Sequence, residues 1–153
     1  MYPASLRSAR LLLALAVLSL AACDAGSDRT ADPSAPHFLV VKVSGAPDFA
    51  ARSVNATIQD GLDINGPDAD GRSVVLTTKA SAPGTYALGT EGTDIRFYQG
   101  KALISATSGT LTITDYVAGQ AAKGTFTFAG AYNGMKVAFT NGSFDVKQGA
   151  NVE

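Results

Sequence analysis

The second half of the chain alternates apolar side chains with threonine, and this pattern restricts it to β-structure. Leu111 and Ile113 alternate with three threonines, and Phe126 and Phe128 alternate with two more. Successive side chains of a β-strand point to opposite faces, so each such run has one buried and one hydrated face. No segment after residue 36 places apolar residues at helical spacing. We therefore predict an all-β domain made of antiparallel strands.

Turn-forming dipeptides divide this region into short strands. Asn133-Gly134 and Asn141-Gly142 each lie between two alternating runs, and an Asn-Gly pair adopts the positive φ angles of a tight hairpin. Ser108-Gly109, Gln99-Gly100 and Pro83-Gly84 interrupt the middle of the chain. We expect strands at 38–44, 51–59, 73–79, 85–88, 94–98, 102–107, 110–115, 123–130, 135–140 and 143–148, with a short extended piece at 62–64.

Eight to ten short strands joined by brief loops predict a single antiparallel β-meander barrel or a two-sheet sandwich. The hairpin-length links favour the meander, and Greek-key connections remain an alternative. A chain of 153 residues has the length of one domain. The predicted core consists of the apolar members of the alternating runs: Val40, Val54, Ile58, Val74, Leu76, Ile95, Phe97, Leu111, Ile113, Phe126, Phe128, Val137, Phe139, Phe144 and Val146.

The first 23 residues have the features of an export signal. Arg7 and Arg10 supply positive charge, and the apolar core Leu11–Leu20 is too short to cross a membrane, since a spanning helix needs roughly 20 residues. The run Leu20-Ala21-Ala22-Cys23 that ends this core resembles the lipobox of bacterial lipoproteins. The resemblance implies diacylglyceryl transfer to the Cys23 sulfur and cleavage before Cys23. The alternative is an ordinary cleaved signal peptide followed by an accidental cysteine.

Cys23 is the sole cysteine, so the chain has no internal disulfide, and lipidation gives this cysteine a role. Two or three acyl chains make membrane attachment effectively permanent. Residues 23–36 are small, polar and proline-containing, which is typical of a flexible linker. Asp24 resembles the inner-membrane retention signal of some enteric-type bacteria, and the choice of membrane stays open. We expect a signal peptide at 1–22, a lipidated cysteine and linker at 23–36, and a β domain at 37–153 in the cell envelope, outside the cytoplasm.

Four runs of the β region occur in a familiar order: Gly84-Thr85-Tyr86, Gly109–Thr114 (GTLTIT), Gly124–Phe128 (GTFTF) and Val137–Val146 (VAFTNGSFDV). Together they resemble a family of uncharacterised bacterial envelope lipoproteins and secreted β domains, over about residues 50–148. The resemblance implies a β fold and an envelope location. It transfers no catalytic residues.

Few residues of the β region suggest chemistry. His37 is the only histidine, and we interpret it as an exposed residue where the linker joins the domain. A zinc site needs several His or Cys ligands, and the chain has one of each. Glu91, Asp94 and Asp115 are scattered, as is Asp145, so the sequence selects no carboxylate pair for glycoside hydrolysis. The formal charge is −1 with no basic stripe, which argues against a nucleic-acid partner.

One acidic stretch, Asp60–Gly71, contains hard oxygen groups of the kind that bind calcium. Aligned to the calcium-loop pattern, however, its first ligand position is Gly66 and its twelfth position is not glutamate. The same residues form ordinary turns, so we expect a metal-free hairpin loop and no cofactor. The alternative calcium ligands are Asp63, Asn65, Asp68 and Asp70.

Four tyrosines at strand ends, Tyr86, Tyr98, Tyr116 and Tyr132, fit two roles: capping the sheet, which we favour, or contacting a sugar or protein partner. We expect a non-enzymatic envelope lipoprotein whose β domain is a binding or accessory module for an envelope protein or a small ligand. The alternatives are an envelope hydrolase acting on glycans or lipids, and a structural lipoprotein with no specific ligand.

Overall fold

The computed structural model describes residues 37–90 and 92–149, and this part of the chain folds as one curled antiparallel sheet without helices. The sheet order is β2-β1-β10-β9-β8-β7-β5-β4-β3, and β6 pairs with β8. The predicted all-β antiparallel fold is therefore confirmed. The strands are β1 Phe38–Val43, β2 Phe49–Ala50, β3 Asn55–Ile58, β4 Leu62–Pro67, β5 Arg72–Thr78, β6 Gly84–Ala87, β7 Asp94–Gln99, β8 Ala102–Val117, β9 Ala121–Tyr132 and β10 Met135–Lys147.

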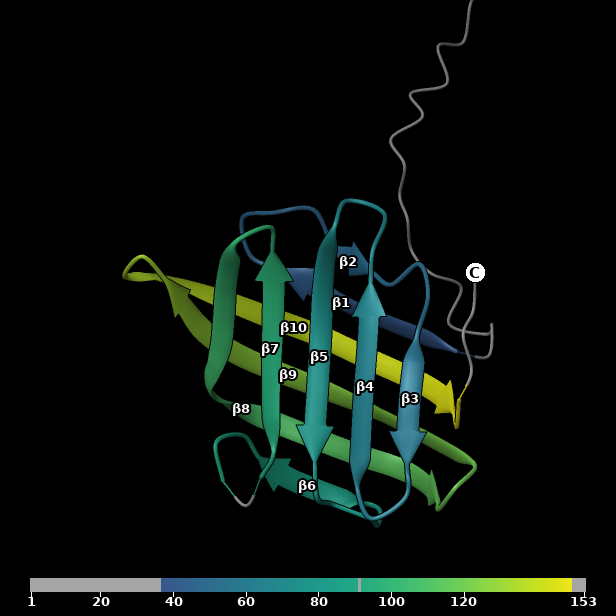
Figure 1. Cartoon of the computed structure of the whole chain (residues 1–153). Helices are drawn as coiled ribbons and strands as arrows, with labels where there is room; N and C mark the ends of the chain where they lie inside the picture. Colours follow the sequence, from purple (N-terminus) through teal and green to yellow (C-terminus); the bar gives the residue numbers. More distant parts are fainter. Residues whose placement is uncertain (1–36, 91, 150–153) are drawn as a thin grey trace, which may run out of the picture.

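Strand β8 turns the sheet into a half-barrel. Its first residues, 102–105, pair with β7, whereas residues 106–117 pair with β9. Figure 1 shows the consequence: β7, β5, β4 and β3 form a front layer that crosses a back layer of β8, β9, β10 and β1. The structure thus combines features of the meander and of the sandwich expected from the sequence: it is a single sheet, and its two halves form the two layers.

Phenylalanine rings join the two layers across the core. Phe97 of β7 lies 5.1 Å, between ring centroids, from Phe139 of β10, which stacks on Phe128 of β9 at 3.9 Å. Phe49 meets Phe97 edge to face at 6.0 Å. Such aromatic pairs stabilise a core by about 0.5–1.5 kcal/mol each beyond the area they bury. Of the predicted core, every residue is buried except Val137, which is half-buried against it, and Val40.

The predicted orientation of Val40 is wrong. Leu39 and Val41 are buried, 0% and 2% exposed, whereas Val40 is half-buried on the outer face. The run Phe38–Val41 is apolar throughout, so it lacks the polar residue that would reveal which face is wet. A one-residue slip then exchanges every side chain of the strand between the faces.

The predicted hairpin at Asn141-Gly142 is also wrong, because β10 continues through these residues with a β-bulge. Asn141 adopts a φ of 52°, which a bulge and a tight turn require alike. Ser108-Gly109 likewise lies inside β8, beside a register shift. The hairpin predicted at Asn133-Gly134 is confirmed: the two residues join β9 to β10 with φ angles of 50° and 79°.

Strand β4 occupies half of the loop expected over residues 60–71 and includes the short extended piece predicted at 62–64. Leu62 and Ile64 are buried and Asp63 is exposed, so β4 alternates although its Asp, Asn, Gly and Pro residues are typical of turns. A Cβ atom on Gly66 would lie 2.8 Å from the side chains of both Ala51 and Leu39, so glycine permits the segment before β3 to pass close to β4. The expected strand 51–59 is correspondingly shorter, Asn55–Ile58.

The outer edge of β3 is covered. Gly119 donates its backbone N–H to the carbonyl of Ile58, and Gly149 donates to the carbonyl of Ala56 at 2.9 Å. The N–H of Ile58 donates to the side-chain oxygen of Gln148. These bonds satisfy an edge that would otherwise be open to pairing with another chain.

Candidate functional site

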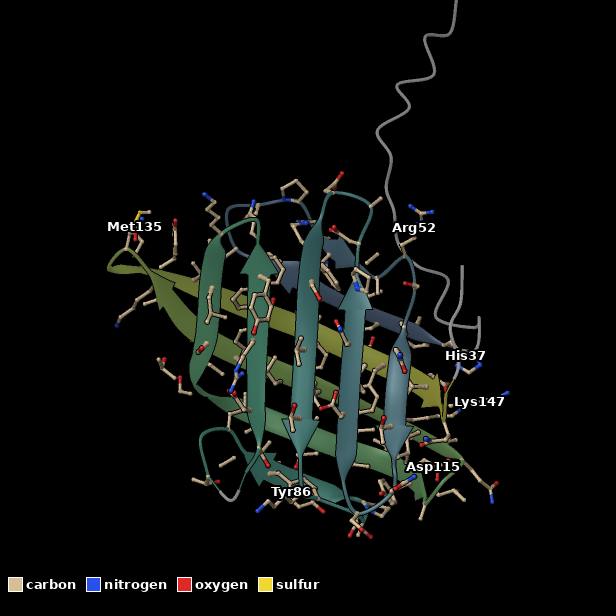
Figure 2. All side chains as sticks on the ribbon, in the orientation of Figure 1. His37, Arg52, Tyr86, Asp115, Met135 and Lys147 are labelled. Carbon is tan, nitrogen blue, oxygen red and sulfur yellow. The ribbon has the colours of Figure 1, made fainter. Side chains whose placement is uncertain are left out.

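The chain enters the domain beside the end of β10. The Nδ1 atom of His37 accepts a hydrogen bond from the backbone N–H of Lys147 at 3.2 Å, and His37 is half-buried rather than exposed. In Figure 2, His37 and Lys147 lie at one end of the molecule and Met135, at the β9–β10 hairpin, lies at the opposite end. Cys23 and the segments predicted as signal peptide and linker lie outside the described residues. The described ranges, 37–90 and 92–149, contain no helix that could span a membrane.

The four calcium candidates do not converge. Asp63 and Asn65 lie on the outer face of β4, where they accept hydrogen bonds from the hydroxyls of Thr77 and Ser73, respectively. Asp68 is buried, while Asp70 is exposed. Across the described ranges, no group of three His, Cys, Asp or Glu residues is placed to hold a metal ion.

Asp68 instead binds Arg72 in a buried ion pair that the sequence did not suggest. Arg72 donates from Nε to the Asp68 carboxylate at 2.6 Å, and the two residues are 7% and 9% exposed. Its other nitrogens donate to the carbonyls of Pro47 and Asp48 at 2.8 and 3.0 Å, and the guanidinium lies 5.8 Å from the centre of the Phe49 ring. Through these contacts Arg72 holds β5 to the loop before β2.

Most of the scattered acids carry partners of their own. Asp94 pairs with Arg96 at 2.7 Å on the front layer, and hydrogen bonds to Tyr98 and Asp94 raise the pKa of Arg96. On the back layer Asp145 pairs with Lys123 at 2.9 Å, and this contact raises the pKa of the lysine. Asp115 lies opposite Lys123 on the neighbouring strand. Glu91 is outside the described residues.

Two of the four tyrosines cap the sheet, as favoured from the sequence. The Tyr116 hydroxyl donates to the carbonyls of Gln59 and Gly61 at 2.6 and 3.0 Å, and the Tyr86 hydroxyl donates to the carbonyl of Ala82 at 2.8 Å. Tyr98 is half-buried beside Arg96. Tyr132 is 39% exposed at the end of β9.

A shallow depression of about 370 Å³ lies on the outer face of β8, β9 and β10. We call its polar side chains the hydroxyl surface. Cross-strand pairing places Thr110 opposite Thr127, and places Thr112 and Ser143 on either side of Thr125. The members of the hydroxyl surface are Thr110, Thr112, Thr125, Thr127, Asn141 and Ser143.

Two further depressions adjoin Thr77 on the outer face of the front layer. One, of about 280 Å³, is lined by Asp60, Asp63 and neighbouring residues of β3 to β5. The other, of about 540 Å³, is lined by the Asp94–Arg96 ion pair and nearby loop residues. Asp63 accepts a hydrogen bond from the hydroxyl of Thr77, and Asp94 pairs with Arg96.

These features define a small all-β domain with an aromatic core and with depressions on both outer faces. The chain belongs to the DUF6252 family of domains of unknown function, whose sequence profile matches residues 40–146. The expected kinship with an uncharacterised family is thus confirmed, while the lipobox and the envelope location stay predictions. No curated protein and no solved structure matches the chain significantly.

Proposed function

We propose that this chain is a bacterial cell-envelope lipoprotein, held on a membrane by lipid on Cys23, and that its β domain is a non-enzymatic binding or accessory module. The observation that carries the proposal is the run Leu20–Cys23, which ends a short apolar core with two small residues and the sole cysteine of the chain. Small residues give a signal peptidase access to the backbone, and the thiol is the group that takes the lipid.

The position of the linker supports this role. The linker joins the domain at His37, beside Lys147, and the β9–β10 hairpin lies at the far end (Figure 2). Strand β10 has 13 residues, so this hairpin extends about 40 Å at roughly 3.3 Å per residue. A domain anchored through its amino terminus therefore has a long face and a distal hairpin available to a partner.

The placement of polar groups favours binding over catalysis. Arg72 and Asp68 form a buried ion pair with each other. Asp94 and Asp145 are paired with Arg96 and Lys123, respectively. Ring contacts join the two layers in the core, and the three depressions described above lie on the outer faces. We therefore favour contact through the surface of the domain over a ligand carried inside it.

The proposal is tested by expressing the full chain and its Cys23→Ser variant in a bacterium fed a labelled fatty acid. The wild-type chain should take up label and sediment with membranes, whereas the variant should do neither. A Ser27→Ala variant, which changes the linker but not the lipobox, should behave as wild type. A Cys23→Ser chain that still sediments with membranes without label would overturn the proposed anchor.

A further inference from the structure

We propose that the hydroxyl surface binds a neutral glycan chain, an inference that rests on the proposed role of the domain as a binding module. The surface is assembled from adjacent strands, so its side chains stand beside one another across the sheet as well as in series along each strand. Thr112, Thr125 and Ser143 form one row across β8, β9 and β10, and Thr85 of β6 extends it. Directly opposed side chains in such a row have Cβ atoms about 4.5–5.5 Å apart.

Part of this surface has unused hydrogen-bonding capacity. Thr112 bonds to Thr85 at 3.1 Å and Thr110 bonds to Thr127 at 3.4 Å, so these hydroxyls have partners within the sheet. The side chains of the other three members, Thr125, Asn141 and Ser143, make no hydrogen bond to any other residue that the structure describes. Hydroxyl and amide groups both donate and accept, which matches the hydroxyl groups of a sugar.

The charges around the depression select an uncharged ligand. None of the residues that line it is ionisable. The charged residues beside the depression are the row Asp115, Lys123 and Asp145, whose lysine is bound to the Asp145 carboxylate at 2.9 Å, and the exposed Lys42 of β1, which pairs with Thr140. An ionic ligand would gain no partner inside the depression and would lose hydration on entering it, whereas a neutral polyhydroxylated ligand exchanges water contacts for similar ones.

The bulge in β10 shapes the floor of the depression. Gly142 is buried, and a Cβ atom there would lie 2.5 Å from the ring of Phe126. The missing side chain lets this ring pack directly behind the strand and leaves an apolar backing under the hydroxyl groups. A volume of about 370 Å³ falls in the usual range of small-molecule sites, about 300–1,000 Å³. Because the depression lies on an outer face, a polymer can pass along it.

The test is a titration of the full chain in detergent, observed through the amide NMR signals of β8, β9 and β10. The neutral probes are the tetramers of N-acetylglucosamine and of glucose, and the charged comparators are the tetramers of glucosamine and galacturonic acid. At least one neutral tetramer should shift the signals of Thr112, Thr125 and Ser143, and the charged tetramers should bind more weakly.

Two variants each remove one hydroxyl group from the outer face and leave the buried core unchanged. Thr125→Val and Ser143→Ala should each weaken binding about three- to tenfold, as the loss of one hydrogen bond predicts. Thr57→Val, an exposed strand threonine on the front layer, should bind as wild type.

The proposal is overturned if neither neutral tetramer shifts these signals at millimolar concentration, or if Thr125→Val and Ser143→Ala bind as tightly as wild type. It is also overturned if Thr125→Val abolishes a crosslink to an envelope protein while the glycan titrations stay flat, since the surface would then dock a protein. Membrane sedimentation of the same chain reports on the Cys23 anchor, so the two proposals fail independently.

Discussion

At the scale of single residues, Arg72 shows how one side chain connects distant parts of the sheet. It starts β5 in the front layer, yet its guanidinium binds the carbonyls of Pro47 and Asp48, which precede β2 in the back layer. The spacing of Asp68 and Arg72 across a tight turn is visible in the sequence. Their burial is not, because it depends on a loop more than twenty positions away.

Replacing Arg72 with methionine should destabilise the domain by about 3–5 kcal/mol, because the Asp68 carboxylate then stays buried without its partner. The measurement is urea unfolding. The double variant Arg72→Met with Asp68→Asn should be less destabilised than the single one, and the exposed-site control Lys101→Met should change little. An Arg72→Met chain with the stability of wild type would show that the ion pair does not hold the loop.

Substitution of two glycines, Gly142 in β10 and Gly134 in the turn before it, distinguishes steric overlap from backbone strain. Gly142→Ala places a methyl group against the Phe126 ring and should cost about 1–3 kcal/mol, as overpacking does. Gly134→Ala has open space around it but a φ of 79°, and should cost about 1–2 kcal/mol. Thermal unfolding measures both losses. Adding Phe126→Leu should recover stability in the Gly142→Ala variant and not in the Gly134→Ala variant. Equal effects of Phe126→Leu in the two variants would contradict the close approach of the Phe126 ring to Gly142.

At the scale of strands, the sequence predicts element type better than element ends. The alternation of Leu111, Ile113, Phe126 and Phe128 with threonine correctly predicted strand structure, because period two is a direct consequence of strand geometry. The sequence nevertheless divided β8 into two strands, 102–107 and 110–115. The Asn-Gly pair at position 141 led to the wrong prediction of a hairpin, because a bulge inside a strand requires the same positive φ angle. The hydroxyl surface could not be predicted for this reason. The sequence shows that its threonines are exposed, but the register that places Ser143 beside Thr125 follows the bulge in β10.

Insertion of two glycines tests this distinction between the two Asn-Gly sites. Between Asn133 and Gly134 the insertion lengthens a hairpin loop and should cost less than about 1 kcal/mol, because loop entropy grows slowly with length. Between Asn141 and Gly142 it interrupts a strand that pairs on both sides, and the domain should unfold or lose several times more stability. Circular dichroism during heating measures both chains. Equal tolerance at the two sites would contradict the continuity of β10.

At the scale of the whole molecule, the half-barrel covers a vulnerable edge and exposes two polar outer faces. Gln148 and Gly149, which follow β10, bind β3, and the described chain begins beside them at His37, so chain entry and sheet closure lie at the same end. The hairpin with Met135, which is 66% exposed, marks the other end. This arrangement, with chain entry at one end and the hairpin at the other, is compatible with the proposed tether at the first end and with partner binding along the length of the domain.

Intact mass spectrometry of the mature protein, purified from bacterial membranes, tests the proposed anchor most directly. We expect a chain that begins at Cys23 and carries the added mass of a diacylglyceryl group on its sulfur. An unmodified product that retains residues 1–22, or one cut at another position with a free thiol, would contradict the lipoprotein assignment.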